Sequence, residues 1–235
     1  MLQPVRSRIG FNPRIKLNVK EYTILALPYL QSQEIELKMA QDRFEISFNG
    51  RGGQGAVTAA TILAKAAFKT GQYPFVMAFP VFGPERRGAP VQAFARISAR
   101  EIHERDKIYN PDIVIVMDAS TLRTANPIPT LREDGVLLVN TGESPESLRE
   151  AYTIPDGIKV GVVDITKICI EINLFISGNA PVFNTPVLGA FCRMIDAIPL
   201  ETMLEAIREN FPGQKNAADL NVQGASLAYE RIMIN

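Results

Sequence analysis

Residues 44–55 read FEISFNGRGGQG, and the main strand and helix pattern of the chain begins here. Phe44 to Phe48 alternate apolar and polar side chains, which is the pattern of a β-strand with one face against a core. The glycine-rich part fits G-x-G-x-x-G, and residues 56–69 follow with an alanine-rich periodicity that predicts a helix, stopped by Gly71. A strand, a glycine turn and a helix in this order are typical of the first unit of a Rossmann-like fold.

The remainder of the chain alternates strand-like and helix-like segments. Residues 112–117, 135–140 and 158–163 are almost continuously apolar, as expected of parallel strands that are covered on both faces. Two further strands are predicted at 73–79 and 91–97. The predicted helices are residues 120–124, 145–152, 165–174, 187–195, 200–210 and 217–233. We therefore predict an α/β fold with a Rossmann-like open, mainly parallel sheet, helices on both faces and a helical C-terminal part.

Residues 1–43 do not share this alternation. They hold three prolines and one apolar patch at residues 22–30. We expect residues 1–43 to form an N-terminal extension or arm that packs on another chain, and residues 44–235 to form one domain. The alternative is that translation begins at Met39, just before the first strand. The intact mass of natively expressed protein separates the two possibilities.

The composition excludes several classes of function. The 235 residues include 25 basic and 25 acidic side chains, so the formal net charge is zero and no strong field gathers nucleic acid or an anionic membrane. No run approaches the ~20 apolar residues that a membrane helix needs. Cys169 and Cys192 are too few for a zinc or iron–sulfur site of their own, and we expect them to be buried free thiols in a reducing cytoplasm.

The glycine turn is the first candidate binding site. Glycines let main-chain N–H groups approach a phosphate, and the start of the following helix adds a partial positive charge. Arg51 could add a bidentate phosphate contact. The candidate ligand-binding residues of this turn are Gly50, Arg51, Gly52, Gly53, Gln54 and Gly55.

A nicotinamide dinucleotide site is disfavoured by the next strand. Such sites use an acidic residue about 20 positions after the glycines to hold the ribose hydroxyls. Residues 73–79 contain no acid, and the next one, Glu85, lies beyond the strand. The sequence favours phosphate binding without NAD. The alternative is that the glycines only permit tight packing of the strand and the helix against a neighbouring chain.

A second unusual loop, AFPVFGPERRGAP at residues 78–90, places two adjacent arginines among aromatic residues and prolines. Arg86 or Arg87 could bind a carboxylate or a phosphate. Alternatively, Glu85 pairs with one arginine while the aromatic residues dock a partner.

The two loops together resemble the gamma subunit of pyruvate:ferredoxin oxidoreductase and its relatives. The resemblance covers about residues 44–229, and it leaves out residues 1–43 because such subunits usually begin just before the glycine turn. The segments that carry it are GRGGQGAVT (50–58), FPVFGPERRGAPV (79–91), YNPD (109–112), VNT (139–141), NTPVLGA (184–190) and QKN (214–216).

This resemblance implies a subunit of an enzyme that oxidatively decarboxylates a 2-oxoacid, most simply pyruvate, with coenzyme A to an acyl-CoA and CO2. It implies alpha, beta and delta-type partner subunits that carry thiamine diphosphate, Mg2+ and [4Fe-4S] clusters, with ferredoxin as electron acceptor. No cofactor is expected on this chain alone. Gly52, Gly53, Gln54 and Gly55 would shape a site for the phosphates of coenzyme A, with Arg86 or Arg87 nearby.

Three interpretations remain open at the level of sequence. The chain is an enzyme subunit that is inactive without partners, an autonomous NAD-dependent oxidoreductase, or a structural assembly subunit whose glycine turn touches no ligand. No catalytic acid, base or nucleophile is identified. The histidine, His103, lies in a charged stretch and is expected at the surface. A relative that acts on 2-oxoglutarate, a branched-chain or an aryl 2-oxoacid would share the same loops.

Overall fold

The computed structural model describes residues 42–81, 89–176 and 179–235. All of them belong to one unit, Asp42–Asn235, whereas the predicted extension lies outside the described residues up to position 41. The strands are β1 (Arg43–Arg51), β2 (Phe75–Val81), β3 (Pro90–Ser98), β4 (Ile113–Val116), β5 (Val136–Asn140), β6 (Lys159–Val163), β7 (Phe175–Ile176), β8 (Ala180–Pro181) and β9 (Met233–Ile234). The helices are α2 (Ala56–Lys69), α3 (Thr121–Thr124), the 3-10 helix η1 (Ile128–Thr130), α4 (Pro145–Tyr152), α5 (Ile165–Ile172), α6 (Pro186–Met194), α7 (Leu200–Glu209) and α8 (Lys215–Arg231).

One seven-stranded sheet has the order β2-β3-β1-β4-β5-β6-β9. The strands β1, β4, β5 and β6 are parallel neighbours. β3 runs antiparallel to both β1 and β2, and β9 runs antiparallel to β6. The predicted open, mainly parallel sheet is therefore confirmed, with β3 inserted between two strands that run the same way.

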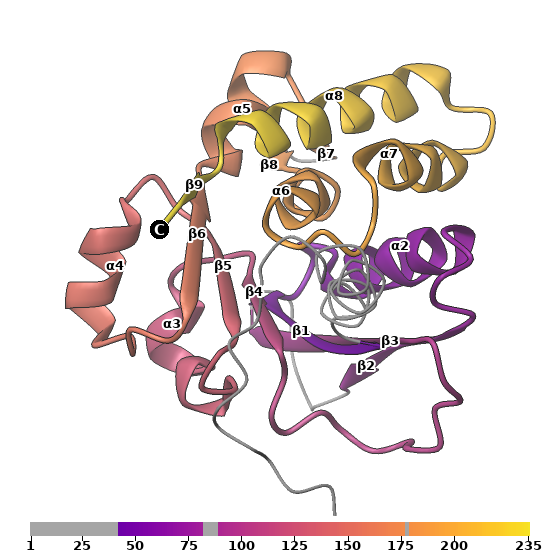
Figure 1. Ribbon diagram of the computed structural model, residues 1–235. Helices are drawn as coiled ribbons and strands as arrows, with labels where there is room; N and C mark the ends of the chain where they lie inside the picture. Colours follow the sequence, from indigo (N-terminus) through magenta and orange to yellow (C-terminus); the bar gives the residue numbers. More distant parts are fainter. Residues whose placement is uncertain (1–41, 82–88, 177–178) are drawn as a thin grey trace, which may run out of the picture. The chain divides into compact units, whose positions relative to one another are not determined.

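Side chains from alternate positions along the strands enter two separate cores. In β4, Ile113 and Ile115 pack into the core beneath α2 and α5–α8, whereas Val114 and Val116 pack into the core beneath α3 and α4. Figure 1 shows α2, α6, α7 and α8 gathered on one side of the sheet, with α3 and α4 on the other. This arrangement explains the continuously apolar strands, because both faces of each strand are buried.

The ends of several elements differ from the sequence-based prediction. The last helix ends at Arg231, and Met233 pairs with Val162 as part of β9. The helix after β6 ends at Ile172, since Asn173 takes the left-handed conformation at φ 56°. The β7–β8 hairpin and β9 were not predicted. Each of these three strands has two residues, which is too short for an alternating pattern to reveal.

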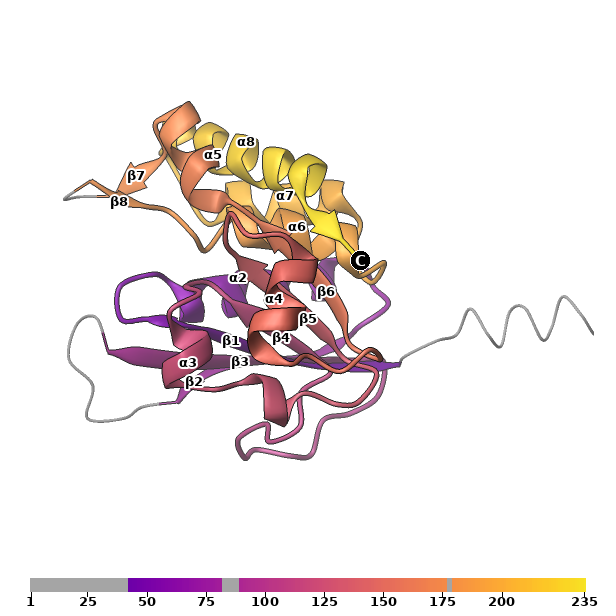
Figure 2. The same ribbon diagram turned by 90° about the vertical axis from the view of Figure 1, so that its left-hand side faces the viewer.

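The parallel strands set the place of the glycine turn. Their carboxyl ends meet at one edge of the sheet, and ligands of open α/β sheets bind in the crevice outside this edge. β1 ends there at Arg51, and Asp118 follows β4 closely. Figure 2 shows the turn between β1 and α2 and the β7–β8 hairpin projecting from the same end of the molecule.

Candidate functional site

The glycine turn closes on itself through main-chain hydrogen bonds. The Gln54 N–H donates to the Arg51 carbonyl at 3.0 Å, and Gly53, the third residue of this four-residue turn, has φ 98°. A type II turn requires a positive φ at that position, which glycine adopts without strain. The Gly52 N–H donates to the carbonyl of Ala89 at 2.9 Å, so the turn is also tied to the start of β3.

Gly55 has a different steric role. It is the N-cap of α2 with φ 81°, and a β-carbon there would lie 2.7 Å from Nδ2 of Asn184. Asn184 precedes α6, so this contact brings the loop after β8 against the glycine turn. Its Oδ1 is buried and has no hydrogen-bond partner among the described residues.

The side chain of Gln54 lies inside the turn. Its Oε1 accepts a hydrogen bond from the Arg51 N–H at 2.7 Å. A β-carbon on Gly50 would lie 2.9 Å from the same Oε1. The glycine at position 50 therefore makes room for Gln54, and Gln54 supports the turn from within.

Asp118 joins this network from the end of β4. Its Oδ2 accepts from Nε2 of Gln54 at 3.0 Å and lies 3.2 Å from Nε of Arg51. Ser120 contacts the same arginine, because its Oγ accepts from Nη2 of Arg51 at 2.7 Å. Burial alone would raise the pKa of the Asp118 carboxyl, but hydrogen bonds from Ser120 and Gln54 and the charge of Arg51 lower it below its ordinary value. Asp118 is therefore an anion that holds both residues of the turn.

The start of α2 faces this edge with its main-chain donors uncapped. No side chain caps the helix within the described chain, and its first turn contains no acidic residue. The first N–H groups of a helix have no partner inside it and carry a partial positive charge. Gly53 at the tip of the turn is exposed. This geometry suits a phosphate or carboxylate group bound at the helix start.

The structure brings together one of the two predicted groups of site residues. Gly50 to Gly55 form a single turn, although Gly50 and Arg51 belong to β1 rather than to a free loop. Arg86 and Arg87 lie outside the described residues. Asp118, Ser120 and Asn184 were not predicted from the sequence. The position of Asp118 directly after an apolar strand was a usable signal, since such positions line the ligand edge of parallel sheets.

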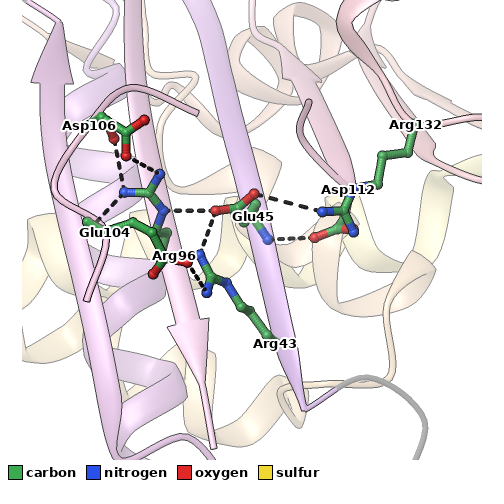
Figure 3. Close-up of polar contacts among 7 residues, drawn as sticks. All are labelled: Arg43, Glu45, Arg96, Glu104, Asp106, Asp112 and Arg132. Atoms are coloured by element: carbon green, nitrogen blue, oxygen red, sulfur yellow. Dashed lines mark hydrogen bonds and ion pairs between the residues drawn. The ribbon is translucent and has the colours of Figure 1, made fainter. Parts of the chain in front are cut away.

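A second polar cluster lies at the opposite end of β1, where the long loop after β3 crosses the sheet (Figure 3). Nε of the buried Arg96 donates to Glu45 at 2.8 Å, and its Nη1 donates to the carbonyls of Glu104 and Asp106. The remaining members are Arg43, Asp112 and Arg132. Each of the four carboxylates in this cluster lies within ion-pair distance of at least one of the three arginines, so the cluster serves to anchor the loop to the sheet.

The other predicted features are placed as follows. Cys169 and Cys192 are both free and buried, as expected. His103 is exposed, also as expected. Across residues 42–81, 89–176 and 179–235, no three His, Cys, Asp or Glu side chains are grouped so that they could share a metal ion. No helix in these ranges combines the length and the apolar character needed to span a bilayer.

Comparison with known proteins places the chain in a family. Residues 45–231 match the family described as pyruvate ferredoxin/flavodoxin oxidoreductase. The common subunit gamma of the pyruvate/ketoisovalerate oxidoreductases of Thermococcus kodakarensis is 44% identical over 190 residues, which is 81% of this chain and 97% of that protein. The pyruvate synthase subunit PorC of Methanothermobacter marburgensis is 44% identical over 188 residues, 80% of this chain and 97% of that protein.

A solved structure agrees with these matches. The crystal structure of pyruvate oxidoreductase subunit PORC from Thermotoga maritima superposes with a TM-score of 0.68 at 36% identity, and the match covers 83% of this chain and 99% of that chain. The family match begins at residue 45 and thus includes the glycine turn and most of β1 before it. The chain belongs to the pyruvate ferredoxin/flavodoxin oxidoreductase family, and within it to the gamma-type subunits.

Proposed function

We propose that this chain is the gamma subunit of a multisubunit 2-oxoacid:ferredoxin oxidoreductase that oxidises pyruvate, and that its glycine turn binds the phosphates of coenzyme A. The family match and the two relatives at 44% identity support the subunit assignment. The overall reaction is the CoA-dependent oxidative decarboxylation of pyruvate to acetyl-CoA and CO2, with ferredoxin as electron acceptor.

The observation that carries the coenzyme A assignment is the uncapped start of α2 behind the glycine turn. A helix start with free N–H groups and no acidic residue in its first turn attracts anions. Gly53 leaves the tip of the turn without a side chain, which lets a phosphate approach the main chain. Of the substrates in this reaction, coenzyme A is the polyanion with phosphate groups, so it fits this site best.

The remaining chemistry belongs to partner chains. We assign thiamine diphosphate, Mg2+ and the [4Fe-4S] clusters to alpha, beta and delta-type subunits, where they supply carbanion chemistry at the keto carbon and electron transfer. A [4Fe-4S] cluster takes four cysteine thiolates. This chain has two cysteines, and both are buried in the core beneath α2 and α5–α8. Its own residues would therefore bind and orient a substrate.

The choice of 2-oxoacid rests on the other subunits. The Thermococcus kodakarensis relative is named as a subunit common to pyruvate and ketoisovalerate oxidoreductases. A subunit shared by enzymes for two substrates does not select between them. We propose pyruvate because two relatives are named for it. Assays of the purified complex with 2-oxoglutarate, ketoisovalerate and an aryl 2-oxoacid test the alternatives.

The coenzyme A role is tested with a pair of glycine variants in the co-expressed complex. Gly53→Leu places a side chain at the exposed tip of the turn, at φ 98°. Gly71→Leu is the control, because Gly71 also has a positive φ of 72°, at the far end of α2, where an added β-carbon meets nothing within 4 Å. Both variants carry left-handed strain, but only one blocks the turn.

We expect Gly53→Leu to assemble with its partners and to raise the KM for coenzyme A about tenfold, a loss of about 1.4 kcal/mol in binding. The KM for pyruvate should stay within twofold of the parent value, and Gly71→Leu should leave both constants unchanged. A KM for coenzyme A that is equal in all three proteins would favour a purely structural subunit. Activity of the isolated chain with NAD would overturn the subunit assignment itself.

A further inference from the structure

We propose that Asp118 is a positioning residue for coenzyme A, which holds the glycine turn in its binding conformation without touching the ligand. This inference rests on the proposed function of the turn. It assigns a role to a residue outside the glycine motif, contributed by a different strand. The juxtaposition that carries it is the Asp118 carboxylate between the side chains of Gln54 and Arg51.

The parallel pairing of β1 and β4 creates this juxtaposition. Asn49 lies opposite Val116 in the register, and the Met117 N–H donates to the Asn49 carbonyl at 2.7 Å. Two residues beyond this pair, Arg51 at the end of β1 and Asp118 just after β4 come side by side. The register of β1 and β4 therefore sets the position of the Asp118 carboxylate relative to the glycine turn.

The contacts of Asp118 reach both ends of the turn. Asp118 holds the side chain of Gln54, because Nε2 of Gln54 donates a hydrogen bond to its carboxylate. Oε1 of the same Gln54 side chain accepts a hydrogen bond from the Arg51 N–H inside the turn. Through its ion pair at 3.2 Å Asp118 also fixes the guanidinium of Arg51. Hydrogen bonds to a charged partner are stronger and geometrically tighter than neutral ones. Removing the charge loosens both residues at once.

Ser120 completes the arrangement on the outer side. Its N–H and hydroxyl donate to Oδ1 of Asp118, which leaves Oδ2 for Gln54 and Arg51. The hydroxyl oxygen also accepts from Arg51, so one arginine bridges both residues. Because its two oxygens already accept these protein donors, the Asp118 carboxylate is held as a support for the turn rather than offered to a ligand.

Electrostatics and positioning predict opposite results for the neutral variant Asp118→Asn. Loss of a negative charge beside a phosphate site strengthens anion binding by simple Coulomb attraction, so it would lower the KM for coenzyme A. Loss of the support for Gln54 and Arg51 would raise the KM for coenzyme A, because a turn that is no longer held in shape does not direct its N–H groups toward the phosphates. The sign of the change therefore separates the two effects.

The experiment compares the complex carrying Asp118→Asn with the parent and with Asp156→Asn. Asp156 is exposed, lies before β6 at the opposite edge of the sheet, and gives the same change of charge. Ser120→Ala serves as a milder second variant that removes the outer support but keeps the acid. Assembly is checked by size-exclusion chromatography. Amide hydrogen exchange of residues 50–58, measured without coenzyme A, reports the turn independently of activity.

We expect Asp118→Asn to speed exchange of the Arg51 and Gln54 amides at least tenfold and to raise the KM for coenzyme A about fivefold, with the KM for pyruvate unchanged. Ser120→Ala should change both in the same direction by less, and Asp156→Asn should change neither. Exchange at the parent rate, or a lowered KM for coenzyme A, would overturn the role of Asp118. Faster exchange with an unchanged KM for coenzyme A would support its hold on the turn and contradict the coenzyme A function of the turn instead.

Discussion

Gly189 of α6 lies so close to Ala225 of α8 that a β-carbon at position 189 would overlap the carbonyl oxygen of Ala225. The two helices thus meet backbone to backbone at this crossing. Because the obstacle is main chain, no side-chain rotation relieves it. The contact fixes α6, and α6 follows the loop that places Asn184 against Gly55.

Gly189→Ala should destabilise the protein by about 3 kcal/mol, since overpacking of this kind forces main chain apart. Gly224→Ala, on α8, is the matched control. A β-carbon there first meets a methyl end of Leu174 at 2.9 Å, which can move, and alanine gains up to about 1 kcal/mol of helix propensity. Urea unfolding monitored by circular dichroism measures both. Equal midpoints for the two variants would contradict the backbone contact.

Arg96→Met should destabilise the protein by about 2–3 kcal/mol, because Glu45 loses its buried partner and keeps only the more exposed Arg43 at 2.8 Å and Arg132 at 3.9 Å. It also removes the donor for the carbonyls of Glu104 and Asp106. We expect faster proteolysis within residues 99–111 in the same variant. The double variant Glu45→Leu with Arg96→Met should be more stable than Arg96→Met alone. If the stability loss of the double variant equals the sum of the losses of Glu45→Leu and Arg96→Met, the two side chains are not coupled.

Glu104 should contribute to the loss of stability in acid. The hydrogen bond from Arg43 lowers the pKa of Glu104 to about 2. A carboxyl whose pKa is lower in the folded than in the unfolded protein stabilises the fold above its ordinary pKa and loses this effect as the pH falls toward 2. The unfolding free energy of Glu104→Gln should therefore fall less than that of the parent between pH 6 and pH 3. Glu150→Gln, at an exposed position of α4, should follow the parent.

Both cysteines should resist alkylation in the folded protein. Burial raises the pKa of Cys169 to about 11 and that of Cys192 to about 12. At pH 8 the thiolate, which is the reactive form, is then about one part in a thousand or less. Mass spectrometry after iodoacetamide treatment should show no adducts on the native protein and two on the protein in urea. Rapid labelling of the native protein would contradict the burial of these side chains.

Local sequence patterns were enough to predict the central strands of the sheet and the main helices. Burial of one face or both faces of an element produces a pattern that is visible in a short stretch of sequence. Such patterns are the alternation at residues 44–48, the continuously apolar strands and the periodicity of residues 56–69. The elements that escaped prediction depend on distant partners. β9 exists because the open edge of β6 pairs with Met233 and Ile234. Nothing in those two residues indicates a strand.

The candidate site likewise has one part that follows from local sequence and another part that depends on distant residues. The sequence alone determined the glycine turn, because positive φ at Gly53 and Gly55 is a local requirement that only glycine meets easily. Its interpretation as a phosphate-binding turn also needed nothing beyond the strand before it and the helix after it. The roles of individual residues within the turn were less accessible, since the space that Gly50 leaves for the side chain of Gln54 shows only in the structure.

The residues that support that turn are brought together by the three-dimensional packing of the chain. Asp118 is 64 positions from Gln54, and their contact depends on the register of two parallel strands. Asn184 lies 129 positions after Gly55, and it is brought against that glycine by the loop that leads into α6, a helix packed against α8. Contacts of this kind arise from pairing and packing over long sequence separations, and these leave no periodic trace in the residues that make them.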